Sequence, residues 1–114
     1  MHKLRAMNSE EAAACARVMK ALANPVRLMI VERLSMGEMC VCELLPLFKL
    51  NQSTLSRHLA CLKNAGIVRE RRDGVRIFHS LACPCVLIVF ECTRRVLGTE
   101  ARRKTRCVPG KRSQ

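Results

Sequence analysis

The chain of 114 residues contains no tryptophan, no tyrosine and only three phenylalanines. Proteins that bind single-stranded nucleic acid stack bases on aromatic side chains, so this scarcity argues against single-strand binding. The sequence also lacks a run of roughly 18 apolar residues that could span a membrane, and it has no apolar export signal near its start. We therefore expect a cytoplasmic protein that does not span a membrane.

Acidic residues are also scarce. Nine Asp and Glu face 21 Lys and Arg, which gives a formal net charge of +12. A positive field of this size on a small chain favours polyanionic partners. Because single strands are disfavoured, we expect the partner to be double-stranded DNA.

The eight cysteines are numerous for a chain of this length. In a reducing compartment they favour thiols and metal ligands over a disulfide framework. The spacing Cys-x-x-Cys, a glycine loop that cradles phosphate and a Cys/His base arrangement are all missing. These absences argue against a thiol oxidoreductase or a reductase of oxyanions, so we expect no enzyme.

Two helices are predicted in the first third of the chain. Asn8 caps a helix over residues 9–23, which carries apolar residues at helical spacing. Asn24 caps the next helix, with proline at its first position, and Gly37 ends it.

The segment 41–66 predicts a helix-turn-helix. Apolar residues from Val41 to Phe48 repeat at helical spacing, and Pro46 implies that this helix is short. Asn51 caps a longer helix that stops at Gly66, which we expect to adopt a left-handed conformation. This order of a short helix, a tight turn and a longer helix is typical of a DNA-binding motif.

The longer helix carries an inward leucine stripe and a small, polar outward face. Such a face suits the major groove, although a solvated surface is the alternative. His58 lies at the edge of the stripe, where a structural histidine and a phosphate contact are equally compatible with the pattern. The candidate DNA contacts are Gln52, Ser53, Thr54, Ser56, Arg57 and His58.

A β-hairpin is predicted beyond Gly66. The strands 67–72 and 75–81 flank Asp73-Gly74, a strong hairpin signal. The hairpin is rich in arginine, and we expect it to act as a wing that contacts the sugar-phosphate backbone, a plain solvated hairpin being the alternative. The candidate phosphate contacts are Arg71, Arg72 and Arg76.

The last predicted helix starts near Pro84. Its stretch Val86–Phe90 is apolar on every side, which a domain of this size cannot hide alone, so we expect a homodimer. From Gly98 onward the chain is polar and basic, which predicts a mobile tail over 98–114 after a single domain over 1–97.

The same region contains further cysteines. On the expected helix, Cys85 and Cys92 share one face and favour interface packing, whereas Cys83-Pro84-Cys85 leaves a second soft-ion pair as an alternative. The pattern assigns no role to Cys107.

Cys40 and Cys42 form the pair that bears most directly on function, because Cys42 precedes the cap Asn51 by nine residues. Thiolates select soft, thiophilic ions. Residues two apart on a regular helix point about 200° from one another, so the two thiols converge only at an unwound helix start or after an ion distorts it. A distortion of this helix start would be transmitted to the adjoining DNA-binding helix. The alternative is a pair of small buried hydrophobic residues.

The stretch Gly37-Glu-Met-Cys-Val-Cys-Glu-Leu44 resembles the Glu-Leu-Cys-Val-Cys-Asp-Leu metalloregulatory box of the ArsR/SmtB family. The similarity extends over residues 15–81 and includes Ser56-Arg57-His58-Leu59, Gly66 and the Asp-Gly turn. It implies a mainly helical, homodimeric winged helix-turn-helix repressor that leaves its operator when trivalent arsenic or antimony binds Cys40 and Cys42.

The chain departs from the family pattern in two places. A third cysteine often follows in the box, and Leu45 stands there instead, so a third ligand would be Cys15 or another thiol. The Asp and His zinc ligands that some members carry on the last helix have no match, which disfavours zinc.

The resemblance therefore predicts a repressor of an arsenic-resistance operon with no organic cofactor. Two alternatives remain: a repressor switched by cysteine oxidation, and a repressor selective for methylated arsenicals or another soft metal. The preference among arsenite, methylarsenite and antimonite is left open.

Overall fold

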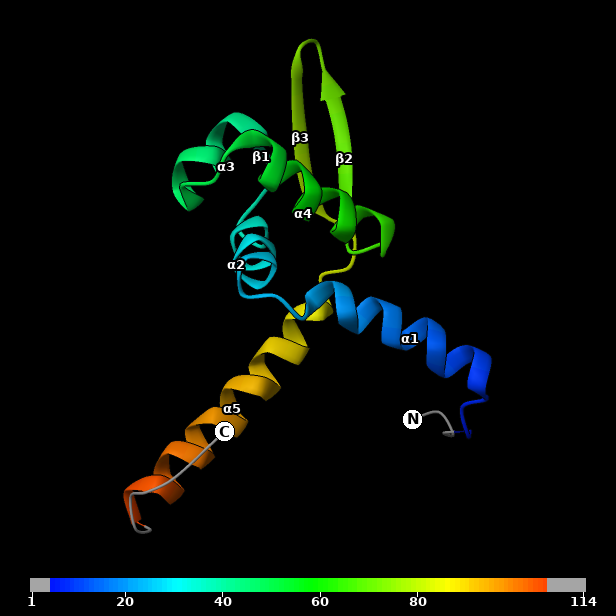
Figure 1. Cartoon of the computed structure of the whole chain (residues 1–114), viewed down its shortest axis with the longest axis vertical. Helices are drawn as coiled ribbons and strands as arrows, with labels where there is room; N and C mark the ends of the chain where they lie inside the picture. Colours follow the sequence, from blue (N-terminus) through cyan, green and yellow to red (C-terminus); the bar gives the residue numbers. More distant parts are fainter. Residues whose placement is uncertain (1–4, 107–114) are drawn as a thin grey trace. The chain divides into compact units, whose positions relative to one another are not determined.

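The computed structural model describes the backbone of residues 5–106 and the side chains of residues 5–99. The chain divides into two compact units, residues 1–84 and 85–114 (Figure 1). The first unit contains four helices and a small sheet, and the second contains one helix.

Two capped helices open the first unit. Helix α1 spans Ser9–Leu22, and the Asn8 side chain accepts a hydrogen bond from the Glu11 amide at 2.7 Å. Helix α2 spans Pro25–Leu34, and the Asn24 side chain accepts from the amides of its first turn. Both caps confirm the sequence prediction, because each side chain satisfies amides that the helix itself leaves unpaired.

The expected helix-turn-helix follows. Helix α3 spans Val41–Phe48, and α4 spans Gln52–Asn64. Lys49, between them, has a φ of 53°, a left-handed conformation that turns the chain sharply. Gly66 closes α4 with a φ of 84°, as predicted, and the Ile67 amide donates back to the Leu62 carbonyl at 3.0 Å.

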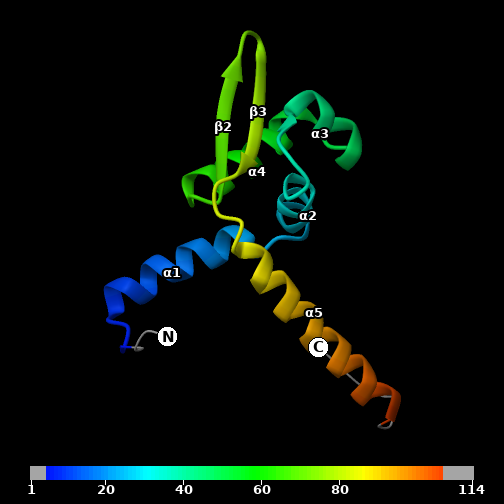
Figure 2. The same ribbon diagram turned by 180° about the vertical axis from the view of Figure 1, so that it is seen from behind.

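The hairpin consists of β2, Val68–Asp73, and β3, Arg76–Leu81, joined at Gly74. It extends past α3 and α4 in both Figure 1 and the reverse view of Figure 2. A short strand that the sequence did not predict, β1 (Met39–Cys40), pairs with β3, so the antiparallel sheet has the order β1-β3-β2. Cys40 is therefore joined to the wing through the sheet, and Cys42 follows it in α3.

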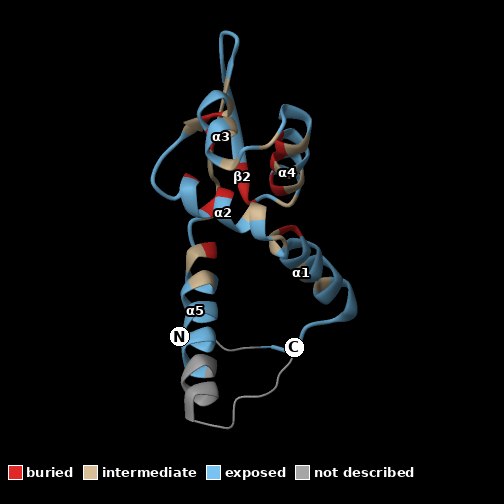
Figure 3. Ribbon diagram, turned by 60° about the vertical axis from the view of Figure 1, so that its left-hand side comes forward, coloured by how far each residue is buried: buried red, intermediate tan, exposed pale blue. Residues whose placement is uncertain are grey.

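The buried core of the first unit lies among α2, α3, α4 and the base of the hairpin (Figure 3). Its leucine stripe on α4 consists of Leu55, Leu59 and Leu62, each at most 3% exposed, which confirms the predicted inward face. This packing holds the leucine face of α4 against the core and leaves the opposite face exposed to solvent. The remaining core residues include Ile30, Val31, Leu34, Leu44, Ile67 and Val68.

The second unit is the helix α5, Val86–Arg106. It runs through Gly98 without a break, so residues 98–106 are helical where the sequence predicted the start of a mobile tail; the remainder of that tail, 107–114, lies outside the described residues. Ile88, Val89, Val96 and Leu97 are each at least 50% exposed on α5. Within the described residues, no helix is long and apolar enough to cross a membrane.

Candidate thiol site and nucleic-acid interface

The exposed face of α4 carries four of the six DNA contacts predicted on this helix. Gln52, Ser53, Ser56 and Arg57 are exposed. Asn51 holds the start of the helix, since its side chain accepts from the Thr54 amide at 2.8 Å and from the Ser53 hydroxyl at 2.9 Å. The helix therefore presents short polar groups and one guanidinium on a rigid support, as groove recognition requires.

Thr54 and His58 are half-buried rather than exposed. The Nη1 atom of Arg27, on α2, lies 3.3 Å from His58 Nδ1, and Arg27 Nε donates to the Ala21 carbonyl at 2.6 Å. Burial lowers the pKa of His58, and the charges of Arg27 and Arg57 lower it further. These contacts turn His58 toward α2 and favour its structural role over a phosphate contact.

The arginines of the wing differ in their surroundings. All three of Arg71, Arg72 and Arg76 are exposed. Arg71, however, donates two hydrogen bonds to the Glu38 carboxylate, at 2.9 and 2.8 Å, and its guanidinium carbon lies 4.7 Å from the centre of the Phe78 ring. Arg72 and Arg76 are therefore better placed for phosphate than Arg71.

Cys40 and Cys42 converge at the start of α3. Cys40 is the N-cap, with extended backbone angles of φ −78° and ψ 149°, so it lies outside the regular helix. The Cys42 amide donates to Cys40 Sγ at 3.2 Å, and the Glu43 carboxylate accepts from the Cys40 amide at 2.9 Å. This reciprocal cap supplies the non-helical start that the sequence argument required for two convergent thiols.

The two thiols have unequal environments. A hydrogen bond from the Cys42 thiol lowers the pKa of Cys40, with smaller contributions from backbone amides and Arg76. The same contact raises the pKa of Cys42. Cys40 is buried at 3% exposure, whereas Cys42 is exposed. Cys42 is therefore the sulfur that solvent reaches.

A third ligand does not join the pair in the part of the chain that the structure describes. No group of three or more Cys, His, Asp or Glu residues that could hold a metal ion occurs there, so Cys15 is not brought to Cys40 and Cys42. The seven described cysteines form no disulfide, and Cys107 lies outside the described residues. Leu45, which stands where the family pattern often has a third cysteine, is half-buried.

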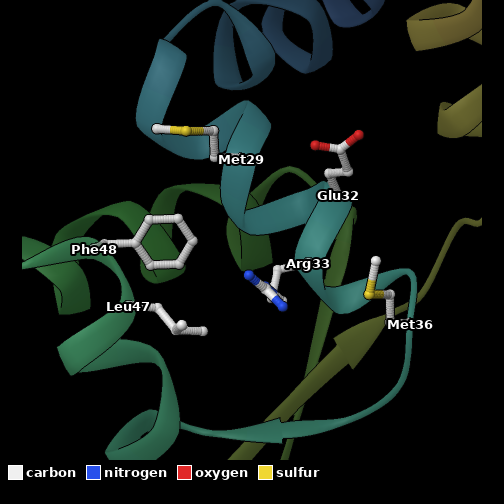
Figure 4. Close-up of a pocket in the computed structure, with 6 residues that line it drawn as sticks. All are labelled: Met29, Glu32, Arg33, Met36, Leu47 and Phe48. Carbon is white, nitrogen blue, oxygen red and sulfur yellow. The ribbon is translucent and has the colours of Figure 1, made fainter.

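A hollow of about 390 Å³ lies between α2 and α3 (Figure 4). Its walls carry no cysteine or histidine, so it does not offer the thiolate chemistry of the Cys40–Cys42 pair. The residues that line it are Met29, Glu32, Arg33, Met36, Leu47 and Phe48.

The helix-turn-helix, the wing and the polar face of α4 define a winged helix-turn-helix DNA-binding protein. Residues 24–70 match the family model described as bacterial regulatory protein, arsR family. A solution structure of a homodimeric winged helix-turn-helix domain from Mycobacterium bovis, described as a possible ArsR-family transcriptional regulator, is 32% identical, with a TM-score of 0.71 over 88% of this chain and 95% of that chain. The chain belongs to the arsR family, and it is accordingly a DNA-binding transcriptional regulator rather than an enzyme.

Two further similarities concern metalloids. The arsenical resistance operon repressor of Staphylococcus xylosus is 39% identical over 64 residues, which span 56% of this chain and 62% of that repressor. The crystal structure of the antimony-specific transcriptional repressor AntR has a TM-score of 0.72 and 26% identity over 90% of this chain and 93% of that chain.

Sequence reasoning missed three residues around the thiols and the wing: Glu38, Glu43 and Phe78. For Glu43 a signal was available, because a Glu three residues after an N-cap is the capping-box pattern. Glu38 and Phe78 gave no local signal, since their partner Arg71 is reached only through the pairing of three strands.

Proposed function

We propose that the protein is a homodimeric repressor that binds operator DNA through α4 and the wing, and that trivalent arsenic or antimony releases it by binding Cys40 and Cys42. The observation that carries this proposal is the pair of thiols at the extended start of α3, where the backbone amide of Cys42 donates a hydrogen bond to Cys40 Sγ at 3.2 Å. Thiolates are the ligands that soft ions select, and one helix and one turn separate this pair from the DNA-reading face.

The chemistry of the site is an exchange of oxygen for sulfur. Each thiol replaces one hydroxyl group of the arsenical, forming an As–S bond and releasing water, with no change of oxidation state. Methylarsenite has two exchangeable hydroxyl groups, and Cys40 and Cys42 together replace both. Inorganic arsenite keeps a third position, which water, a small thiol or a cysteine of the partner subunit would fill.

Ligand binding would alter the start of α3. The Cys40 sulfur caps this helix by accepting from the Cys42 amide. Bridging both sulfurs to one arsenic atom changes the geometry that this cap requires, and α3 directly precedes α4 along the chain. A ligand that prefers the altered geometry weakens DNA binding, and DNA weakens ligand binding by the same factor, typically about 5- to 150-fold.

The homodimer is supported by the apolar side chains that α5 leaves exposed and by the homodimeric state stated for the Mycobacterium bovis relative. A twofold-symmetric pair would place two copies of α4 on successive major grooves of the duplex.

The test is a DNA-release titration. A duplex selected by the protein from a random pool is labelled, and its release is followed by fluorescence anisotropy under full reduction, with arsenite, methylarsenite, antimonite, zinc and cadmium as separate titrants. The proposal expects release by the trivalent metalloids and loss of release in Cys40→Ser and Cys42→Ser. Release by peroxide alone, reversed on re-reduction, would instead identify a thiol redox switch.

A further inference from the structure

Cys40, Phe78 and Arg71 form one row across the sheet. Cys40 of β1 pairs with Phe78 of β3, and Phe78 in turn pairs with Arg71 of β2. Residues directly opposite one another in antiparallel strands place their side chains on the same face, with Cβ atoms about 5 Å apart. The buried thiol, the aromatic ring and the guanidinium are thus consecutive neighbours on one face.

Arg71 also contacts the segment that carries the thiols. Its two hydrogen bonds reach the carboxylate of Glu38, two residues before Cys40 and 33 residues from Arg71 in sequence. Its guanidinium also lies over the Phe78 ring at 4.7 Å. A bidentate, stacked arginine has a defined orientation, so this cluster fixes β2 of the wing relative to β1.

The ion pair is exposed, with side-chain exposures of 52% for Arg71 and 35% for Glu38. Exposed pairs contribute little to stability, so the importance of this one lies in the geometry that it fixes. The hydrogen bond from Arg71 lowers the pKa of Glu38.

We propose that Glu38, Arg71 and Phe78 are positioning residues that transmit the state of the Cys40–Cys42 pair to the wing. The inference rests on the proposed function. When an arsenical draws Cys40 and Cys42 together, β1 shifts, Phe78 and Arg71 follow it, and the wing changes its angle to α4. The wing cations then leave their phosphates. In this arrangement Arg71 couples two sites and does not itself contact DNA.

The primary variant is Glu38→Gln, which removes the carboxylate charge at nearly constant shape. Three quantities are measured under full reduction: methylarsenite affinity without DNA, DNA affinity without methylarsenite, and DNA affinity at saturating methylarsenite. We expect the first two to stay within about twofold of wild type. The ratio of DNA affinities without and with methylarsenite, which measures the coupling, should fall about tenfold.

Arg72→Gln is the matched control, because it removes the same charge as Arg71→Gln from the adjacent position of β2. It should weaken DNA binding and leave the coupling ratio at the wild-type value. Arg71→Lys distinguishes the two roles of Arg71: a lysine keeps a phosphate contact but loses the bidentate, stacked geometry. We expect Arg71→Lys to lower the coupling ratio, and Arg71→Gln to leave the salt dependence of DNA binding unchanged.

Wild-type coupling in Glu38→Gln and Arg71→Lys would overturn the inference, as would a salt slope reduced by about one in Arg71→Gln. Failure of the proposed function would give a different result from failure of this inference, because the wild-type protein itself would then show no release of DNA by methylarsenite.

Discussion

Cys40 caps the helix on which Cys42 lies: the Cys42 amide donates to Cys40 Sγ at 3.2 Å. One sulfur is therefore both a structural acceptor and one half of a soft-ligand pair. In the proposed function, an ion bound at this pair changes the geometry around the sulfur that caps α3 and so alters the helix that precedes α4.

The first prediction concerns this pair. Cys40→Ser and Cys42→Ser should each abolish release of DNA by arsenite, because a hydroxyl does not replace a thiolate as an arsenic ligand. Serine is a preferred N-cap residue, so Cys40→Ser should keep the fold and bind DNA like wild type. Cys83→Ser and Cys92→Ser are the controls and should release DNA normally. If Cys40→Ser or Cys42→Ser still releases DNA at the arsenite concentrations that act on the wild type, the sensing site lies elsewhere.

The second prediction concerns the reading helix. Arg57 is exposed on α4, so Arg57→Ala should weaken binding to the selected duplex by about 1–3 kcal/mol and relax its sequence preference. Sedimentation should show an unchanged assembly state, because Arg57 is remote in sequence from α5. Undiminished affinity for the selected duplex would contradict the assignment.

The third prediction concerns the wing. Arg72→Ala should weaken binding to all duplexes alike and lower the slope of log affinity against log salt by about one, as expected for one lost phosphate contact. The measurement is a salt titration with the selected duplex and with an unrelated one. A loss confined to the selected duplex would show that Arg72 reads bases instead.

The helix caps and the recognition face could be predicted because their signals are local. Asn8, Asn24 and Asn51 each satisfy amides within three residues, and Gly66 adopts the φ that favours glycine. Strand β1 could not be predicted from two residues, because its existence depends on pairing with β3 almost forty residues later.

Two other features depended on tertiary context. His58 lies at the edge of the leucine stripe, and only the position of Arg27 shows which side it faces. The polar and basic composition from Gly98 onward predicted a mobile tail, yet α5 continues to Arg106, since a single glycine inside a helix costs only about 1 kcal/mol.

The fourth prediction concerns assembly. Val89 is 50% exposed on α5, within an apolar stretch that needs a partner surface. Val89→Asp should convert a dimer to monomers or aggregates, which analytical ultracentrifugation at micromolar concentration would show. Glu91→Gln, a change at an exposed polar position of the same helix, is the control. A well-folded wild-type monomer under these conditions would refute the homodimer.

The last prediction concerns ligand preference, and it follows from the number of thiols that the fold brings together. Within the described residues, Cys40 and Cys42 have no third ligand beside them. Methylarsenite needs two sulfurs and inorganic arsenite has three exchangeable positions, so methylarsenite should release DNA at the lower concentration. Leu45→Cys should add a third sulfur three residues after Cys42 and shift the ligand preference of the protein toward arsenite. Anisotropy titrations of both proteins with both arsenicals give the comparison. If wild type responds to arsenite at least as well as to methylarsenite without added small thiols, a third protein thiol takes part, and Cys15→Ser would show whether it is Cys15.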